Sequence, residues 1–446
     1  MIKEFAKKFL PKGLLGFYYQ LYPFLGALRH CFPSKKLIII GVTGTNGKST
    51  VVHLVSAVLK EAGFSVASMS SVRFQIKGRE WKNMLKMTMP GRFLLQKFLS
   101  QAVKSGCKYA VLEVTSEGIK QFRHKFIDFD VAVFTNLTKE HIESHGNFEN
   151  YRKAKEKLFK ATKNIHIINT DDNNAKYFLE FPAKEKYLYC LKNGFSQIKA
   201  IDQNSNTIKE IKELSFDLQL PGEFNLYNAT AAICVGISQG IDLDICKKAV
   251  EKAETVPGRM EKVISSPFEV FVDYAHTPDA LQKVYQTLAN LHKLPINDTN
   301  IREISGHIRA HSQLICVLGS CGGGRDKWKR KELGEIAANY CGQIILTNED
   351  PYDENPMEII NQIGYGIKDI SADQRSHQRK SAVFKILDRR RAIRKALELA
   401  KEGDIVIVTG KGSEPWMCVE GGKKISWDDR ETVREEFNKL TNIKSG

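Results

Sequence analysis

Short apolar runs that end at glycine or polar residues recur along the chain. The first of them, Leu37–Val42, is rich in isoleucine and contains no polar side chain, which is typical of a strand buried in a parallel sheet. It runs into the sequence GTNGKST, after which Ser49–Ala62 carries apolar residues at helical spacing and stops before Gly63. The pattern predicts a strand, a glycine loop and a helix in succession.

Further runs of this kind alternate with helical stretches. They are Tyr109–Val114, Val131–Thr135 and His166–Asn169 in the first half of the chain, and FEVFVDYAH, QLICVLG, GQIILTNED and DIVIVTGKG in the second. This alternation predicts an α/β fold with a mostly parallel sheet and functional groups beyond the carboxyl ends of its strands. We expect a short helical arm over residues 1–35, a central domain over 36–258 and a C-terminal domain over 259–446.

Length and composition are those of an ordinary globular protein. The 446 residues exceed what one core organises, and 42% hydrophobic with 26% charged residues excludes a disordered or fibrous chain. Nine scattered cysteines, none in a CxxC, suggest neither a disulfide framework nor a zinc site. The 67 Lys and Arg against 51 Asp and Glu give a net charge of +16, which favours anionic partners without choosing among nucleotides, nucleic acid and membranes.

The N-terminal stretch Leu14–Leu28 is apolar and aromatic, yet too short for a typical membrane-spanning helix. It also lacks the small-residue cleavage site of a signal peptide. Because Lys3, Lys7, Lys8 and Lys12 precede or begin it, one interpretation is a helix that lies at a membrane surface. The other is a hydrophobic arm that packs on the next domain, and the sequence leaves both open.

The sequence GTNGKST has the features of a phosphate-binding loop. Backbone N–H groups of a glycine turn can cradle phosphates while the following helix directs its positive end at them. Lys48 would then reach the terminal phosphates, and Ser49 would ligate Mg²⁺. The strict Walker spacing fails by one residue, because Val42 stands where the first glycine is expected. The predicted ATP-binding residues of the loop are Gly44, Thr45, Asn46, Gly47, Lys48, Ser49 and Thr50.

The loop is also the form found in the Mur ligase family, and further blocks follow in that family's order. They are EVTSEGIKQFR, NLTKEHIESHGNFENYRKAK, GEFNLYNATAA, PGRME, DYAHTPDAL, GGGRDKWKR, NEDPYDENP and GKGSE. The chain therefore resembles the Mur ligases, and among them the muramyl-tripeptide synthetase branch. The resemblance implies a central P-loop ATPase domain, a Rossmann-like C-terminal domain, and an amide ligase that uses ATP and two Mg²⁺ ions and acts through an acyl phosphate.

The resemblance also assigns residues whose role the sequence alone does not reveal. By themselves, a glutamate at a strand end, two histidines four residues apart and a lysine in a basic helix are most simply solvated groups. By resemblance, Glu113 holds Mg²⁺, His141 binds a second Mg²⁺, and Lys155 is carbamylated and so presents an anion to a metal. The implied catalytic set is Lys48, Glu113, His141 and Lys155, and the metal set is Ser49, Glu113, His141 and carbamylated Lys155.

Three further groups match substrate-binding positions of the family. The implied ATP contacts beyond the loop are Asn225, Asn228, Arg259, Asp273, His276 and Lys327, with Asp273 on the ribose and Arg259 near γ-phosphate charge. In the basic block that contains Lys327, Arg325 and Lys329 compete for its role. The implied acceptor-binding residues are Thr88, Thr115, Ser116, Gln121 and Arg123. The implied amino-acid-binding residues are Glu349, Asp350, Tyr352, Gly410 and Glu414.

Two departures from the family pattern bear on the substrates. Tripeptide synthetases place a UDP-binding domain before the phosphate loop, and residues 1–35 are too few for one. We therefore expect either another way of holding UDP or a lipid-linked acceptor. Where diaminopimelate-adding enzymes carry DNPR, this chain has Glu349–Tyr352, whose acidic residues favour lysine or ornithine over a substrate with an extra carboxylate, unless Arg325 compensates.

Other functions fit the sequence less well. A folylpolyglutamate-synthetase-like ligase shares the loop, but the blocks DYAHTPDAL and NEDPYDENP argue against it. A P-loop nucleic-acid motor would suit the basic charge and the run RRRAIRK, but no RNA- or DNA-binding module is recognisable. A non-catalytic relative would not need Lys48, Glu113, His141 and Lys155 together. We expect a cytoplasmic monomer that binds a muramyl-peptide-type acceptor and a diamino acid, binds no nucleic acid, and contacts the membrane peripherally through residues 1–30.

Overall fold

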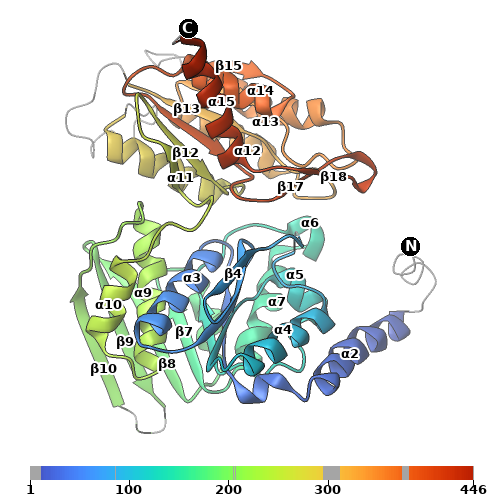
Figure 1. Cartoon of the computed structure of the whole chain (residues 1–446), viewed down its shortest axis with the longest axis vertical. Coiled ribbons are helices and arrows are strands. Elements are labelled where there is room, and N and C mark those ends of the chain that lie inside the picture. The colour runs from blue at the N-terminus through green and yellow to red at the C-terminus, as the bar shows by residue number, and fades with distance from the viewer. Residues whose placement is uncertain are drawn as a thin grey trace. The chain divides into compact units, whose positions relative to one another are not determined.

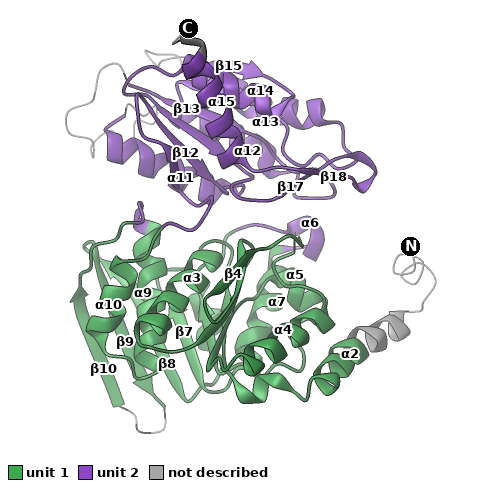
Figure 2. Ribbon diagram, in the orientation of Figure 1, with its two compact units in different colours: residues 1–138, 148–219, 224–254 green, residues 139–147, 220–223, 255–446 purple. Residues whose placement is uncertain are grey.

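The computed structural model describes residues 12–85, 87–203, 205, 207–294, 312–373 and 381–444. The chain divides into two compact units (Figure 2), the first of residues 1–138, 148–219 and 224–254 and the second of 139–147, 220–223 and 255–446. Lys3, Lys7 and Lys8 of the expected arm lie outside the described residues. None of the helices in the described ranges is long and apolar enough to cross a membrane.

The first unit is built on a ten-stranded sheet in the order β10-β9-β8-β7-β6-β1-β5-β2-β3-β4. Its strands are β1 Ile38–Thr43, β2 Val66–Met69, β3 Arg73–Ile76, β4 Arg79–Lys82, β5 Tyr109–Glu113, β6 Val131–Phe134, β7 Ile165–Asn169, β8 Glu185–Lys192, β9 Phe195–Asp202 and β10 Thr207–Leu214. The central strands pair in parallel, and the β-hairpins at both edges are antiparallel. Because central strands are covered on both faces, they read as continuous apolar runs, and the predicted strands of this half are confirmed.

The helices of the first unit pack against this sheet or against one another (Figure 1). They are α2 Lys12–Arg29, α3 Lys48–Glu61, α4 Arg92–Lys104, α5 Ser116–Lys120, α7 Phe148–Ala161, α8 Ala175–Leu179, α9 Glu223–Ser238 and α10 Leu243–Glu251, with a 3-10 turn over Pro33–Lys36. The apolar spacing of Ser49–Ala62 thus predicted α3 to within one residue at each end. The buried core joins side chains of β1, β5 and β6 to those of α4 and α7.

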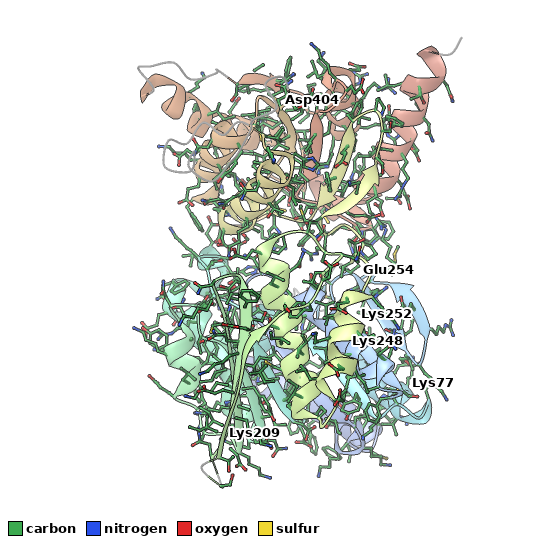
Figure 3. All side chains as sticks on the ribbon, turned by 90° about the vertical axis from the view of Figure 1, so that its left-hand side faces the viewer. Lys77, Lys209, Lys248, Lys252, Glu254 and Asp404 are labelled. Carbon is green, nitrogen blue, oxygen red and sulfur yellow. The ribbon has the colours of Figure 1, made fainter. Side chains whose placement is uncertain are left out.

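Helix α3, which begins at the phosphate loop, is contacted by α10 and by the residues that follow α10. Lys248 and Lys252, at the end of α10 (Figure 3), approach Glu61 at 3.4 and 2.9 Å. The ring of His53 lies 3.2 Å from the Glu254 carbonyl oxygen, and burial lowers its pKa to about 4. The exposed ion pairs contribute little stability, so the buried apolar face of α3 is the main support of the helix.

The second unit has a six-stranded sheet in the order β11-β12-β16-β13-β14-β15 and a separate two-stranded sheet, β17-β18. The strands are β11 Glu261–Ile264, β12 Glu269–Asp273, β13 Leu314–Leu318, β14 Gln343–Leu346, β15 Ala382–Lys385, β16 Ile405–Thr409, β17 Trp416–Cys418 and β18 Lys424–Ser426. The helices are α6 Ile142–His145, α11 Pro278–His292, α12 Lys329–Tyr340, α13 Pro356–Asp373, α14 Arg389–Leu399 and α15 Asp429–Lys444, with a 3-10 turn over Glu420–Gly422. All strands of the six-stranded sheet except β11 pair in parallel. The predicted α/β class is therefore confirmed in both units.

Two glycines let α12 and α13 pack closely. A Cβ at Gly334 would lie 2.0 Å from the carbonyl oxygen of Ile363, and one at Gly366 would lie 2.1 Å from that of Lys331. Backbone atoms cannot move aside as a flexible side chain can. Glycine is therefore required at this helix crossing.

We expect Gly334→Ala to lower the free energy of unfolding by about 1–3 kcal/mol, because the methyl group overpacks the crossing. The sign is informative, since alanine in an exposed helix would instead stabilise by about 1 kcal/mol. Urea unfolding measures the change. Gly91→Ala, whose added Cβ meets nothing within 4 Å, is the matched control. An unchanged unfolding midpoint for Gly334→Ala would show that the helices are not held this tightly.

Candidate active site

The turn between β1 and α3 can be built only with glycine at two positions. Gly44 has φ 154° and Gly47 has φ 83°. A Cβ on Gly44 would lie 1.9 Å from Thr135 Oγ1, and one on Gly47 would lie 2.3 Å from Asn228 Oδ1. The loop therefore passes directly against the residues that follow β6 and against α9.

Polar groups beyond the end of β6 hold the loop in place. Asn136 accepts a hydrogen bond from Asn46 N at 2.9 Å through its side chain and one from Thr45 N at 2.9 Å through its carbonyl. Thr135 Oγ1 donates to the Asn46 carbonyl at 2.7 Å. The Thr45 hydroxyl lies 3.0 Å from Tyr151 OH. These bonds organise the loop before any phosphate binds, which is what anion recognition by backbone N–H groups requires.

A carboxylate and a serine hydroxyl meet at the first turn of α3. Ser49 Oγ donates to Glu113 Oε2 at 2.7 Å, and Ser71 N donates to the same oxygen at 2.9 Å. Lys48 Nζ donates to the Thr45 carbonyl at 2.7 Å. Hard oxygen donors at a phosphate loop fit Mg²⁺, which typically takes one or two protein ligands and completes its shell with phosphate oxygens and water. Within the described ranges, no group of three or more His, Cys, Asp or Glu could hold a metal ion.

Lys155 is buried beneath the loop. It lies on α7, donates from Nζ to the Gly44 carbonyl at 2.6 Å, and sits 4.6 Å from the centre of the Tyr151 ring. Burial lowers the pKa of Lys155 well below its ordinary value, and the charge of Lys48 lowers it further, while Glu113 opposes the shift. The basic residues around Lys155 suggested a solvated surface position, which was misleading. Lys155 lies on the side of α7 that faces the core.

Asn225 and Asn228 lie on the same buried side of α9. Asn228 Nδ2 donates to Asn225 Oδ1 at 3.0 Å, and Asn228 also borders Gly47. The pair is therefore next to the phosphate loop. Its predicted contact with ATP stays a prediction.

The predicted acceptor-binding residues gather just beyond the end of β5. Thr115 caps α5 by accepting from Gly118 N at 3.1 Å, and Ser116 is buried behind it. Arg123 donates to Gln121 Oε1 at 2.7 Å and to the carbonyl of Met89, the residue after Thr88. Residues from three separate stretches of the chain thus lie near the end of β5, which is also the position of Glu113.

His141 belongs to the segment 139–147, which is part of the second unit, whereas Glu113 and Lys155 belong to the first. The segment is tied to the start of α12 by a buried ion pair, in which Lys329 Nζ donates to Glu140 Oε1 at 2.9 Å. His141 itself has φ 57° and precedes the short helix α6. Its assignment as a metal ligand stays a prediction.

The basic block GGGRDKWKR contains both Lys327 and Lys329. Lys327 is exposed and pairs with Glu354 at 3.3 Å, whereas Lys329 is buried.

The predicted nucleotide contacts of the second unit surround the end of β12. Both oxygens of Asp273 accept backbone bonds, from Met260 N at 2.7 Å and from Ala275 N at 2.6 Å. Burial raises the pKa of Asp273, and the charge of Arg259 opposes this. The Arg259 guanidinium lies 4.2 Å from the centre of the Tyr274 ring, and His276 Nδ1 lies 2.9 Å from the Tyr274 carbonyl. Tyr274, not predicted from the sequence, is the residue that connects this group.

The predicted amino-acid-binding residues form one connected cluster at the ends of β14 and β16. Lys411 Nζ lies 2.9 Å from Asp350 Oδ2 and 2.5 Å from Glu414 Oε2, and Glu414 Oε1 accepts from Tyr274 OH at 2.9 Å. Gly410 leaves room for Glu349, whose Oε2 would be 2.4 Å from a Cβ there.

The cluster places the carboxyl groups of Glu349, Asp350 and Glu414 beside Lys411, and Arg325 is a second cation next to them. Burial raises the pKa of Glu349, while the charges of Arg389 and Lys411 oppose this shift. Burial alone would lower the pKa of Lys411, but the carboxylates of Glu414 and Asp350 raise it above its ordinary value. Two carboxylates thus face one ammonium. Tyr352 lies at the edge of the cluster, where its side chain hydrogen-bonds Arg325.

Sequence reasoning missed several residues that shape these sites. Lys411 lies inside the recognised block GKGSE, and a lysine two residues after a buried strand was a usable signal for a site residue. Thr135 is the last residue of a predicted strand, and Asn136 follows it. Ser71 had no signal, because it acts through its backbone N–H and lies after a strand of only four residues.

A parallel sheet with a strand, glycine loop and helix, and with a strand-end carboxylate on the serine of the loop, defines a P-loop nucleotide-dependent enzyme. The model of the Mur ligase middle domain matches residues 42–236, and that of the Mur ligase glutamate ligase domain matches residues 258–412. The chain belongs to the Mur ligase family. It is an ATP-dependent ligase that joins an amino acid to a carboxylic acid.

Individual relatives agree with this family. The UDP-N-acetylmuramoyl-L-alanyl-D-glutamate--2,6-diaminopimelate ligase of Syntrophomonas wolfei is 37% identical over 415 residues, which cover 90% of this chain and 78% of that protein. The UDP-N-acetylmuramyl-tripeptide synthetase of Roseiflexus sp. is 33% identical over 439 residues, covering 93% and 81%. The folylpolyglutamate synthase of Mycobacterium tuberculosis has a TM-score of 0.63, with 88% of this chain and 92% of that chain covered, but at 18% identity the likeness shows a shared fold alone.

We expect Glu113→Gln to lower kcat for phosphate release by about 100-fold or more, because it removes the negative charge that a metal at this site needs. The amide can still accept hydrogen bonds from Ser49 and Ser71, so the fold should be retained. Steady-state kinetics over a range of Mg²⁺ concentrations, with unfolding in urea alongside, measure both effects. Glu61→Gln, a surface glutamate, is the control. Wild-type kcat and Mg²⁺ dependence in Glu113→Gln would contradict this role.

Proposed function

We propose that the chain forms an amide between the free carboxylate of a muramyl-peptide-type acceptor and the amine of a diamino acid, with ATP converted to ADP and phosphate. The observation that carries this proposal is the contact of Glu113 with Ser49 at the phosphate loop. Glu113 precedes Thr115, one of the predicted acceptor-binding residues, by two positions. Phosphate and carboxylate chemistry would then meet at the ends of two neighbouring strands, β1 and β5.

The reaction has two steps. A carboxylate oxygen of the acceptor attacks the γ-phosphorus, the bond to the β-γ bridging oxygen breaks, and ADP leaves. The amine nitrogen then attacks the carbonyl carbon of the acyl phosphate, phosphate leaves with the electrons of the C–O bond, and the nitrogen loses a proton. Positioning and charge neutralisation supply most of the acceleration. Lys48 and the loop N–H groups would hold the transferred phosphoryl group, and Arg123 would hold the acceptor by a carboxylate.

Ser49 and Glu113 would hold one Mg²⁺, which when bound neutralises phosphate charge. We propose that Lys155 is carbamylated and serves a second Mg²⁺. A carbamate replaces a buried cation by an anion beside the loop, which removes the repulsion between Lys155 and Lys48. The family-based roles of His141 in metal binding, and of Arg259, Asp273, His276 and Lys327 in nucleotide binding, belong to the same proposal.

The names of the relatives favour a UDP-linked muramyl peptide as acceptor and diaminopimelate as amino acid. The cluster of Asp350, Glu414 and Lys411 supports a diamino acid, because the carboxylates of Asp350 and Glu414 already bind one ammonium and can accept a second. Tyr352 stands where the diaminopimelate-adding motif has its arginine, and Arg325, the cation that could compensate, is hydrogen-bonded to Tyr352. We therefore propose that lysine is a better substrate than diaminopimelate for this chain.

Phosphate release with crossed panels of acceptors and amino acids tests the proposed reaction. The acceptors are a UDP-muramyl dipeptide and the same dipeptide without UDP, and the amino acids are lysine, ornithine, diaminopimelate and glutamate. We expect turnover only when both substrates are present, and a higher kcat/KM for lysine than for diaminopimelate. Tyr352→Arg should raise the relative use of diaminopimelate about tenfold, since a guanidinium can pair with the extra carboxylate. Glutamate as the preferred amino acid would overturn the proposal, and a preference for diaminopimelate would overturn its choice of lysine.

For Lys155, we expect Lys155→Met to lower kcat by at least about 100-fold without unfolding the protein, because methionine fills a similar buried volume. Labelled bicarbonate should give the wild type a carbamate signal in ¹³C NMR that this variant lacks. Lys157→Met, an exposed lysine on the same helix, is the control and should keep both activity and signal. Full activity of Lys155→Met, or a carbamate signal unaffected by it, would contradict the proposal.

A further inference from the structure

From residue 21 to residue 28, helix α2 presents its large apolar side chains to solvent and its small residues to the protein. Among residues 21–28, the buried positions are Pro23, Gly26 and Ala27. The other five, all exposed, are Leu21, Tyr22, Phe24, Leu25 and Leu28. The small residues permit a close approach to α4, where a Cβ on Gly26 would lie 3.3 Å from the Cα of Phe93. The amphipathic pattern is therefore the reverse of that of a helix that covers a core.

Residues far away in the sequence extend this apolar face. Phe93 and Leu94 at the start of α4 and Phe126 after α5 are exposed as well. The rings of Phe24 and Phe126 are 5.4 Å apart, and those of His30 and Phe93 are 5.3 Å apart. We call the combined set the α2–α4 face: Leu21, Tyr22, Phe24, Leu25, Leu28, Phe93, Leu94 and Phe126. Such a continuous exposed apolar patch marks an interaction site.

Basic residues predominate around the face, with Asp128 as an exposed acidic residue near Phe126. Arg29, Lys97 and Lys104 all act on His30, whose pKa is lowered by burial and then by these three cations. Lys35, Lys36 and Lys125 are exposed nearby in the sequence. The sequence contains no acidic residue from Phe5 to Lys60, nor from Trp81 to Leu112. Both α2 and α4 are therefore free of negative charge along their whole length.

We propose that the α2–α4 face binds the surface of an anionic lipid bilayer. A bilayer offers both chemistries that the face needs, an apolar interior for the exposed leucines and aromatics and anionic headgroups for the lysines and arginines around them. A second copy of this face would bring like charges together, which disfavours a symmetric dimer. The proposal stands on the arrangement of α2 and α4 and does not depend on the identity of the ligase substrates.

The position of the face gives the binding a use, and this step rests on the proposed function. Phe93 and Leu94 follow Thr88 by a few residues, and Phe126 follows Arg123. Both Thr88 and Arg123 are predicted to hold the acceptor. Membrane binding through the α2–α4 face would therefore bring the acceptor-binding residues close to lipid.

Co-sedimentation of the full-length protein with vesicles tests the proposal. We expect binding to phosphatidylglycerol vesicles, little binding to phosphatidylcholine vesicles, and weaker binding when salt is raised from about 0.05 to about 0.5 M. Leu25→Asp with Leu28→Asp, at side chains 45% and 54% exposed, should lower the bound fraction at least tenfold. Amide synthesis with water-soluble substrates should be unchanged in this variant, which shows that it is folded.

The matched control changes two equally exposed apolar residues elsewhere, Ile208→Asp with Leu291→Asp, at 55% and 56% exposure. It should bind vesicles as the wild type does. The proposal fails if the wild type does not sediment with phosphatidylglycerol, or if both double variants bind equally. It also fails if light scattering without lipid finds a dimer that only Leu25→Asp with Leu28→Asp dissociates, because the face would then be a protein interface.

Discussion

The parallel register of β1 with β5 and β6 is the constraint on which the active site of the first unit depends. Val42 pairs with Glu113 and Thr43 with Phe134, so three strands end at one edge of the sheet. The strand ends therefore bring together the phosphate loop, the carboxylate of Glu113 and the side chains of Thr135 and Asn136. Glycine at 44 and 47 is the consequence, because the loop passes so close to the neighbouring residues that a Cβ has no room.

Each of the two units contains a buried lysine at its predicted site. Lys155 in the first unit lies under the loop with a carbonyl as its hydrogen-bond acceptor, whereas Lys411 in the second unit lies between two carboxylates. The first arrangement is costly for a charged ammonium, and burial shifts its pKa down. The second compensates the charge, and the pKa of Lys411 is shifted up. The same side chain is thus suited to modification in one setting and to fixing the carboxylates of a pocket in the other.

Helix α2, on the surface of the first unit, departs from the usual distribution of apolar side chains. Core-forming helices bury their large side chains, but α2 buries proline, glycine and alanine and exposes leucine and phenylalanine. A helix packed in this way contributes little apolar burial to the fold. Its packing on α4 nevertheless joins two sequence-distant apolar stretches in one basic surface. Of the two interpretations that the sequence left open for this arm, packing on the domain is observed at Pro23, Gly26 and Ala27. The exposed side chains between Leu21 and Leu28 are what the membrane proposal explains.

The sequence alone determined the α/β class, the central strands of both sheets, the phosphate loop and the family, because buried parallel strands and glycine turns leave continuous and local signals. In the first unit it did not reveal β2, β3, β4, β8, β9 and β10, which are short or partly exposed. Only the tertiary structure decided that Lys155 is buried, that Lys411 and Tyr274 connect the predicted pocket residues, and that α2 exposes its apolar side. These outcomes depend on which face of a helix meets its neighbour and on which strands become adjacent, and no short stretch of sequence encodes either.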